Sequence, residues 1–300
     1  MDDMIKIIDL HFRQQKQAIA AFLVETSVGP VLVETGPHST FHNLEVALCD
    51  YGYKTLDIKH VFITHIHLDH AGAAWVFAKH GATIYLHPLG VPHLQNPEKL
   101  MTSARRIYLD EMDILWGDMQ AIPANQLRAM GNLEKVNIGG VGFRALHTPG
   151  HAMHHVAWEV NGVAFTGDVA GVKIGDTGPV MPPCPPPDIN IEDWRASLAF
   201  LKSRRFKSLY LTHFGEVTNP KAHLIELEGR LQNWANWIKP FWETGTPMED
   251  VVPQFKVYVE QQLAPAQLTE SERNSYELAN PADMSVAGLF RYWTKQTKQA

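Results

Sequence analysis

The chain has 300 residues, of which 45% are hydrophobic, 10% aromatic and 19% charged, and its formal net charge is −6. This composition is that of a globular protein with a sizeable core and excludes a disordered chain. The acidic balance disfavours a nucleic-acid partner, because a phosphate backbone binds to a concentrated cationic surface. Two cysteines exclude a disulfide framework and a thiolate-rich zinc site.

The sequence shows no sign of export or of membrane insertion. Residues 2 and 3 are acidic, where a signal peptide carries positive charge. No apolar run approaches the roughly 20 residues that a membrane helix needs. We therefore expect a cytoplasmic protein with no membrane partner.

The first half of the chain predicts short strands that alternate with helices. Apolar β-forming runs predict strands at 20–25, 31–34, 59–64 and 83–86, and helical spacing of apolar residues predicts helices at 38–51 and 69–80. Residues 93–130 then predict a mostly helical insertion that carries Tyr108 and Trp116.

The second half predicts more sheet and then only helices. Strands are expected at 142–147, 156–160, 163–166 and 208–212, and a helix is expected at 191–205. The prolines of segment 182–187 exclude a regular helix and a central strand. We expect this segment to be stiff and to form one wall of a cleft. Helical patterns at 221–242, 247–263 and 283–298 form the tail. We therefore predict a catalytic domain over 1–215 and a C-terminal helical extension over 216–300.

The run His65-Ile66-His67-Leu68-Asp69-His70 carries the strongest chemical signal in the sequence. It lies where an apolar strand ends and a helix of small residues begins. An extended backbone points His65 and His67 to the same side, whereas Asp69 and His70 begin a turn and point elsewhere. Imidazole and carboxylate ligands in this arrangement suit zinc, iron or manganese.

Two metal ions need further ligands, and residues of the right type follow three later strands. His147-Thr148-Pro149-Gly150-His151, Gly167-Asp168 and Thr212-His213 stand at these strand ends. Ligands drawn from loops at one edge of a rigid sheet form a preorganised site. Ligand chemistry alone leaves the choice between His147 and His151 open.

The order His-x-His-x-Asp-His, Thr-Pro-Gly-His, Gly-Asp and strand-end His resembles the metallo-β-lactamase superfamily over about residues 18–215. Within it, the glyoxalase II and lactonase branch of bacterial hydrolases is the most similar. The resemblance implies an α+β fold, a four-layer αββα sandwich with the metals at one edge between its sheets. It selects His151 over His147 and implies these ligands: His65, His67 and His151 for one metal, Asp69, His70 and His213 for the other, and Asp168 bridging both.

Such a site predicts a dinuclear hydrolase that contains two divalent ions, most readily Zn²⁺, with iron or manganese as alternatives. A metal-bridging hydroxide would attack the carbonyl of an ester, thioester or lactone in a small-molecule substrate. Asp69 and Asp168 are the expected catalytic carboxylates. A phosphodiesterase or nuclease and an iron-dependent sulfur dioxygenase are the alternative reactions, and a ligand-binding or structural subunit is the non-enzymatic one.

Several other residues leave two interpretations open. His154 and His155 could orient ligands or touch substrate, and packing is the more common role for such residues. Tyr108 and Trp116 could line a pocket or pack within the insertion. The tail helices could contact substrate, cover the cleft or form a homodimer contact.

Overall fold

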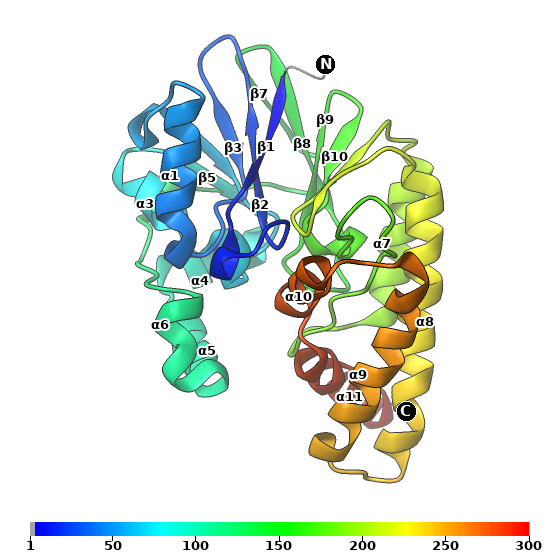
Figure 1. The fold of residues 1–300 in the computed structure, drawn as a ribbon. Coiled ribbons are helices and arrows are strands. Elements are labelled where there is room, and N and C mark those ends of the chain that lie inside the picture. Colours follow the sequence, from blue (N-terminus) through cyan, green and yellow to red (C-terminus); the bar gives the residue numbers. More distant parts are fainter. Residues whose placement is uncertain (1–3, 300) are drawn as a thin grey trace.

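Two mixed β-sheets form the centre of the molecule, and each has six strands within residues 4–299, the part of the chain that the computed structural model describes (Figure 1). The first sheet has the order β1 (Ile5–Asp9), β2 (Ala20–Val24), β3 (Val31–Val33), β4 (His60–Phe62), β5 (Thr83–Leu86), β6 (Leu127–Ala129). The second has the order β12 (Gly215–Val217), β11 (Leu209–Leu211), β10 (Val163–Phe165), β9 (Val156–Val160), β8 (Val141–His147), β7 (Lys135–Ile138). The acidic residues 2 and 3 lie outside the described range.

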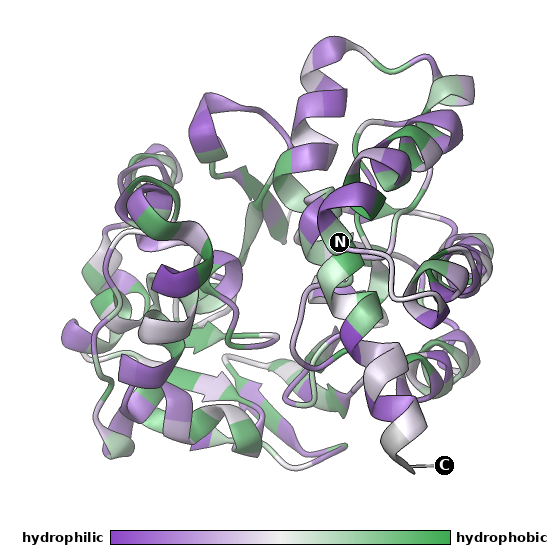
Figure 2. Ribbon diagram, turned by 90° about the horizontal axis from the view of Figure 1, so that it is seen from below, coloured by the Kyte–Doolittle hydropathy of each residue, from purple (hydrophilic) through white to green (hydrophobic). Residues whose placement is uncertain are grey.

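Helices cover the outer face of each sheet (Figure 1). Those of the first half are α1 (Phe41–Asp50), α2 (Leu68–Ala71), α3 (Ala74–Lys79), α4 (Val91–Gln95), α5 (Glu98–Tyr108), α6 (Met112–Leu115). Those of the second half are α7 (Ile191–Ser203), α8 (Pro220–Glu243), α9 (Met248–Leu263), α10 (Glu270–Ala279), α11 (Ala282–Gln299). The helices alternate hydrophobic and hydrophilic residues along their length, whereas most strands are hydrophobic (Figure 2). None of these helices is long and apolar enough to cross a membrane.

Three apolar layers fill the spaces between these elements. Between the sheets, Phe22 and Phe62 of the first sheet meet Phe143 and Trp158 of the second, and the Phe62 and Phe143 rings stack at 4.4 Å. A second layer joins the first sheet to α1, α3 and the insertion, and a third joins the second sheet to α7 and α8–α11. The architecture is therefore the αββα sandwich that the resemblance implies, and the C-terminal helices share their core with the second sheet.

Strand direction brings the candidate ligands to one edge of the sandwich. Strands β3, β4 and β5 run parallel in the first sheet, and β10 and β11 run parallel in the second. His65 follows β4, and Asp168 and His213 follow β10 and β11. Because parallel strands end at the same edge, the loops after them lie side by side.

The observed elements differ from the sequence expectations in a few places. The predicted helix 69–80 is split into α2 and α3, and the insertion ends in strand β6 rather than in helix. The second sheet extends through β12 to Val217, two residues past the expected domain boundary. The short edge strands β6, β7 and β12 carry exposed polar residues and lack the apolar runs that mark buried strands.

Candidate metal centre

The first four candidate ligands lie on the connection between β4 and α2 and in α2 itself. His67 occupies the N-cap position of α2 with extended backbone angles, so His65 and His67 project to the same side. Asp69 and His70 lie in the single turn of α2 and project in another direction. The local change from strand to helix therefore divides four neighbouring residues into two pairs.

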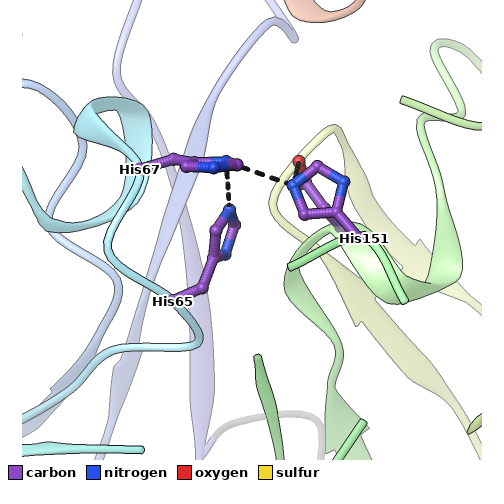
Figure 3. Close-up of side chains that lie close together, drawn as sticks. His65, His67 and His151 are labelled. Carbon is purple, nitrogen blue, oxygen red and sulfur yellow. Dashed lines mark hydrogen bonds and ion pairs between the residues drawn. The ribbon is translucent and has the colours of Figure 1, made fainter. Parts of the chain in front are cut away.

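Three histidines converge in the first cluster (Figure 3). The Nε2 atom of His65 lies 2.9 Å from Nδ1 of His67, and Nε2 of His151 lies 3.1 Å from the same atom. Asp168 joins them, with its Oδ2 atom 3.2 Å from Nε2 of His151. One potential ligand atom from each of the four residues lies within 4.8 Å of the others. Such a group can hold a metal ion.

The second cluster consists of Asp69, His70 and His213. The Oδ2 atom of Asp69 lies 3.4 Å from Nε2 of His213 and 3.7 Å from Nε2 of His70. Asp168 faces this cluster too, since its Oδ1 atom lies 3.2 Å from Nε2 of His70 and 3.4 Å from Nε2 of His213. The two oxygens of Asp168 thus face different clusters.

The chemistry of these atoms fits bound metal. Nε2 of His70, Nε2 of His213 and Oδ1 of Asp168 are buried and have no hydrogen-bond partner within residues 4–299. Leaving such groups without a hydrogen bond in the interior is costly, and coordination would satisfy all three. Imidazole nitrogen and carboxylate oxygen are ligands of zinc, iron and manganese alike.

Hydrogen bonds to the outer ring nitrogens orient two of the histidines. Nδ1 of His151 donates to the carbonyl of Pro183 at 2.9 Å, and Nδ1 of His213 donates to the carbonyl of Ala18 at 2.6 Å. A ring that donates from Nδ1 keeps a lone pair on Nε2, which is the form that binds metal. Both carbonyls therefore favour the ligand form of the ring.

Glu34 orients His70 in the same way, and the sequence analysis missed it. This buried residue follows β3, and its Oε1 atom lies 3.2 Å from Nδ1 of His70. The hydroxyl of Thr64 donates to the same oxygen, and that of Thr212 lies 3.5 Å from it. A carboxylate directly after the fully apolar strand Val31–Val33 was the signal that could have identified it.

Two glycines allow the downstream loops to reach the site. Gly150 has φ +135°, and a Cβ atom there would lie 2.3 Å from Cα of Trp194. Gly167 has φ +46°, and a Cβ atom would lie 2.4 Å from the hydroxyl oxygen of Thr64. Each precedes a candidate ligand, so close backbone approach explains glycine in Thr-Pro-Gly-His and in Gly-Asp.

The two clusters differ in their electrostatics. Burial lowers the pKa of His67 to about 4, and neighbouring imidazoles add to the lowering. Burial likewise lowers the pKa of His65 and His151. For His70 and His213 burial also favours the neutral ring, but Asp168 and Asp69 outweigh it and raise both pKa values. The first cluster is thus a set of neutral imidazoles beside a carboxylate, and the second is rich in ion pairs.

Other histidines flagged in the sequence lie beside the clusters. The ring of His147 packs at 4.1 Å from that of His87, and its Nε2 atom lies 2.9 Å from the carbonyl oxygen of Met130. His155 pairs with the hydroxyl of Thr148 at 2.9 Å. His154 packs at 6.0 Å from the ring of His67. The geometry gives His147 a partner outside both clusters, as expected for a residue that is not a ligand.

The aromatic residues of the insertion pack against each other. Trp116 stacks on Phe12 with ring centroids 5.6 Å apart, and Tyr108 meets Trp116 edge-on at 5.1 Å. Burial raises the pKa of the Tyr108 hydroxyl, and the charge of Asp69 adds to the effect. Both residues therefore pack within the insertion. Tyr108 also lies near enough to Asp69 for the charge of that candidate ligand to affect its hydroxyl.

Comparison with known proteins identifies the family and relatives that the chain resembles. Residues 17–213 match the family model of the metallo-beta-lactamase superfamily. The chain is 30% identical over 173 residues to the metallo-beta-lactamase fold-containing protein ST1585 of Sulfurisphaera tokodaii, a match that covers 55% of this chain and 63% of that protein. It is 27% identical over 164 residues to an N-acyl homoserine lactonase of Bacillus cereus, covering 45% and 54% respectively.

The fold likeness extends further than these sequence matches. The chain spans less than two thirds of either relative. The crystal structure of the metallo-beta-lactamase family protein TTHA1429 from Thermus thermophilus superposes with a TM-score of 0.67 at 19% identity, over 99% of this chain and 94% of that one. The family match covers well over half of the chain and ends at His213, the last candidate ligand. The chain belongs to the metallo-β-lactamase superfamily.

Proposed function

We propose that the protein is a metal-dependent hydrolase that holds two divalent ions, most readily Zn²⁺, and cleaves an ester, thioester or lactone. The observation that carries the proposal is the position of Asp168, whose two oxygens face two separate groups of imidazole and carboxylate ligands. A shared carboxylate between two such groups is the arrangement that a pair of ions requires.

The proposed division of ligands follows the two clusters. His65, His67 and His151 would hold one ion, Asp69, His70 and His213 would hold the other, and Asp168 would contact both. Two ions at these positions would supply a water nucleophile that is active near neutral pH and an electrophile for the substrate oxygen. Five of the seven ligands are buried, which limits the access of bulk water to these positions: His65, His70, His151, Asp168 and His213.

Asp69 differs from Asp168 in its access to solvent. Its side chain is 21% exposed, whereas that of Asp168 is 5% exposed. Burial opposes ionisation of Asp69, but His70 and His213 outweigh it and lower the pKa of the carboxyl to about 2. Asp69 is therefore an ionised carboxylate that an incoming substrate can reach, and we propose that it accepts a proton from the attacking water and passes it to the leaving group.

The choice of a carbonyl substrate rests on three arguments. The lactonase of Bacillus cereus is a relative of this chain, and its name gives N-acyl homoserine lactone as its substrate. The net charge of −6 disfavours a polyanionic nucleic-acid substrate. A complete second cluster also disfavours the single-iron oxidative alternative. Membership of the glyoxalase II and lactonase branch is part of this proposal.

Purified protein should be analysed for metal and assayed against p-nitrophenyl esters, acyl thioesters, N-acyl homoserine lactones and a phosphodiester. We expect two equivalents of metal and hydrolysis of at least one carbonyl substrate. Asp168→Ala should lose metal and lower kcat/KM by at least about 10²-fold, because the shared ligand is gone. Asp176→Ala, which removes an exposed carboxylate, is the matched control. Full activity of Asp168→Ala with unchanged metal content would contradict the proposal.

A further inference from the structure

Two polar side chains of the C-terminal helices hold the segment that carries Pro183. Asn280 follows α10, and its Nδ2 atom donates to the carbonyl of Pro182 at 3.2 Å. Ser285 lies on α11, and its Oγ atom accepts from the backbone N–H of Cys184 at 3.3 Å. The Ser285 hydroxyl donates in turn to Oδ1 of Asn280 at 2.8 Å. We call Asn280 and Ser285 the clamp.

Ser285 of the clamp binds the same peptide unit that orients His151, and Asn280 binds the peptide before it. The carbonyl of Pro183 and the N–H of Cys184 belong to one planar peptide, so an interaction that fixes one fixes the direction of the other. Ser285 accepts from the N–H end of this peptide, and Nδ1 of His151 donates to its carbonyl end at 2.9 Å. The hydrogen bonds therefore run without a break from Asn280 through Ser285 and the peptide to the imidazole, and each polarises the next.

Burial makes this chain of contacts hard to replace. The side chains of Ser285, Cys184 and His151 are fully buried, so water has little access to substitute for a lost partner. The helix also lies directly on the segment: a Cβ atom at Gly288 would be 1.9 Å from the carbonyl oxygen of Cys184. Helix α11 thus approaches the backbone of this segment as closely as glycine allows.

We propose that Ser285 and Asn280 are positioning residues for His151. They set the orientation of the Pro183–Cys184 peptide and thereby hold the imidazole with its Nδ1 proton outward and its Nε2 lone pair toward the first cluster. The C-terminal extension contributes to metal affinity in this way without supplying a ligand. The inference rests on the proposed metal-binding function.

The test is a titration of metal-free protein with Co²⁺, followed by its visible absorption. Ser285→Ala removes the acceptor for the Cys184 N–H, and we expect one of the two Co²⁺ equivalents to bind about 3- to 10-fold more weakly. This is below the 10- to 100-fold typical of direct partners of ligands, because Ser285 acts through a peptide. Asn280→Asp keeps an acceptor for Ser285 and loses the donor to Pro182, so it should weaken binding of the same Co²⁺ equivalent. This second variant also tests the inference if Ser285→Ala does not fold.

The matched control is Thr294→Ala on the same helix. The Thr294 hydroxyl accepts from Nε1 of Trp242 at 3.0 Å and donates to the carbonyl of Phe290 at 2.9 Å, so its loss removes two hydrogen bonds of α11 without touching Pro183. We expect wild-type affinity for both equivalents in this variant. ¹⁵N NMR of metal-free Ser285→Ala should also show a mixture of His151 tautomers where the wild type shows the Nδ1–H form.

Three results would overturn the inference. They are wild-type Co²⁺ affinity in both clamp variants, an unchanged His151 tautomer, and equal weakening in Thr294→Ala, which would indicate a general effect of helix stability. Because the readouts are affinity and tautomer, they do not depend on hydrolysis. A wild-type chain that binds Co²⁺ and hydrolyses no substrate contradicts the proposed function, while the comparison of variants still decides the inference.

Discussion

At the scale of single residues, the orientation of a ligand depends on groups that are not themselves ligands. His70 faces both Asp168 and Asp69 through Nε2, and the carboxylate of Glu34 meets its other ring nitrogen. A carboxylate behind a histidine fixes its tautomer and raises its basicity. Glu34 thus orients His70 of the second cluster through Nδ1, as the Pro183 carbonyl orients His151 of the first.

We predict that Glu34→Gln weakens metal binding at the second cluster by about 10-fold while the fold is retained. The amide keeps the volume of the side chain and an acceptor for Nδ1 of His70, but it lacks the negative charge. Isothermal titration with Zn²⁺ measures the effect. Glu25→Gln, which changes a carboxylate bound by the Tyr53 hydroxyl at 2.7 Å, should bind as the wild type does. Equal affinities for the two variants would show that the charge of Glu34 is not needed.

At the scale of helices and strands, the sequence predicted most of the buried elements and none of the edge strands β1, β6, β7 and β12. Apolar runs such as Val163–Phe165 mark buried strands, because burial selects hydrophobic side chains. Helix α10 was missed because its sequence is mostly polar. Its position in the fold depends on contacts with segments that are remote in the sequence. Its Ser275, for example, donates to the carbonyl of Lys16 at 2.7 Å across 259 positions.

The same distinction holds for the candidate site. Local motifs, together with the family resemblance that selected His151 over His147, pointed to the seven residues that the structure brings together, because each follows a strand end. The groups behind the ligands could not be found this way. The carbonyl of Ala18 meets His213 across 195 positions, and an ordinary carbonyl has no sequence signature. Such partners follow only from the packed fold.

We predict opposite effects on stability for alanine at two helical glycines. A Cβ at Gly288 of α11 would collide with the Cys184 carbonyl, so Gly288→Ala should destabilise the protein by about 1–3 kcal/mol. Gly229 of α8 is exposed, and a Cβ there would meet nothing within 4 Å in the described part of the chain. Gly229→Ala should therefore stabilise the protein by about 0.5–1 kcal/mol, because alanine has the higher helix propensity. Urea unfolding measures both, and destabilisation of equal size would contradict the steric explanation.

At the scale of the whole molecule, the candidate ligands come from both halves of the sandwich. Residues 65–70 follow a strand of the first sheet, whereas His151, Asp168 and His213 follow strands of the second. Each cluster contains residues of both groups. Metal bound at either cluster would therefore link the two halves, and the free energy of binding would stabilise the whole fold.

We accordingly predict that removal of metal lowers the melting temperature of the whole protein by at least about 10 °C, the effect of losing one ion. An ion at 1,000 times its dissociation constant stabilises the native state by about 4 kcal/mol, and each kcal/mol shifts the midpoint by about 2–4 °C in chains of 150–250 residues. Calorimetry with and without EDTA measures the shift, with elemental analysis to verify removal. Asp168→Ala, which lacks the shared ligand, should melt at nearly the same temperature in both conditions. A wild-type midpoint that stays unchanged after verified loss of metal would show that the clusters do not join the halves of the fold.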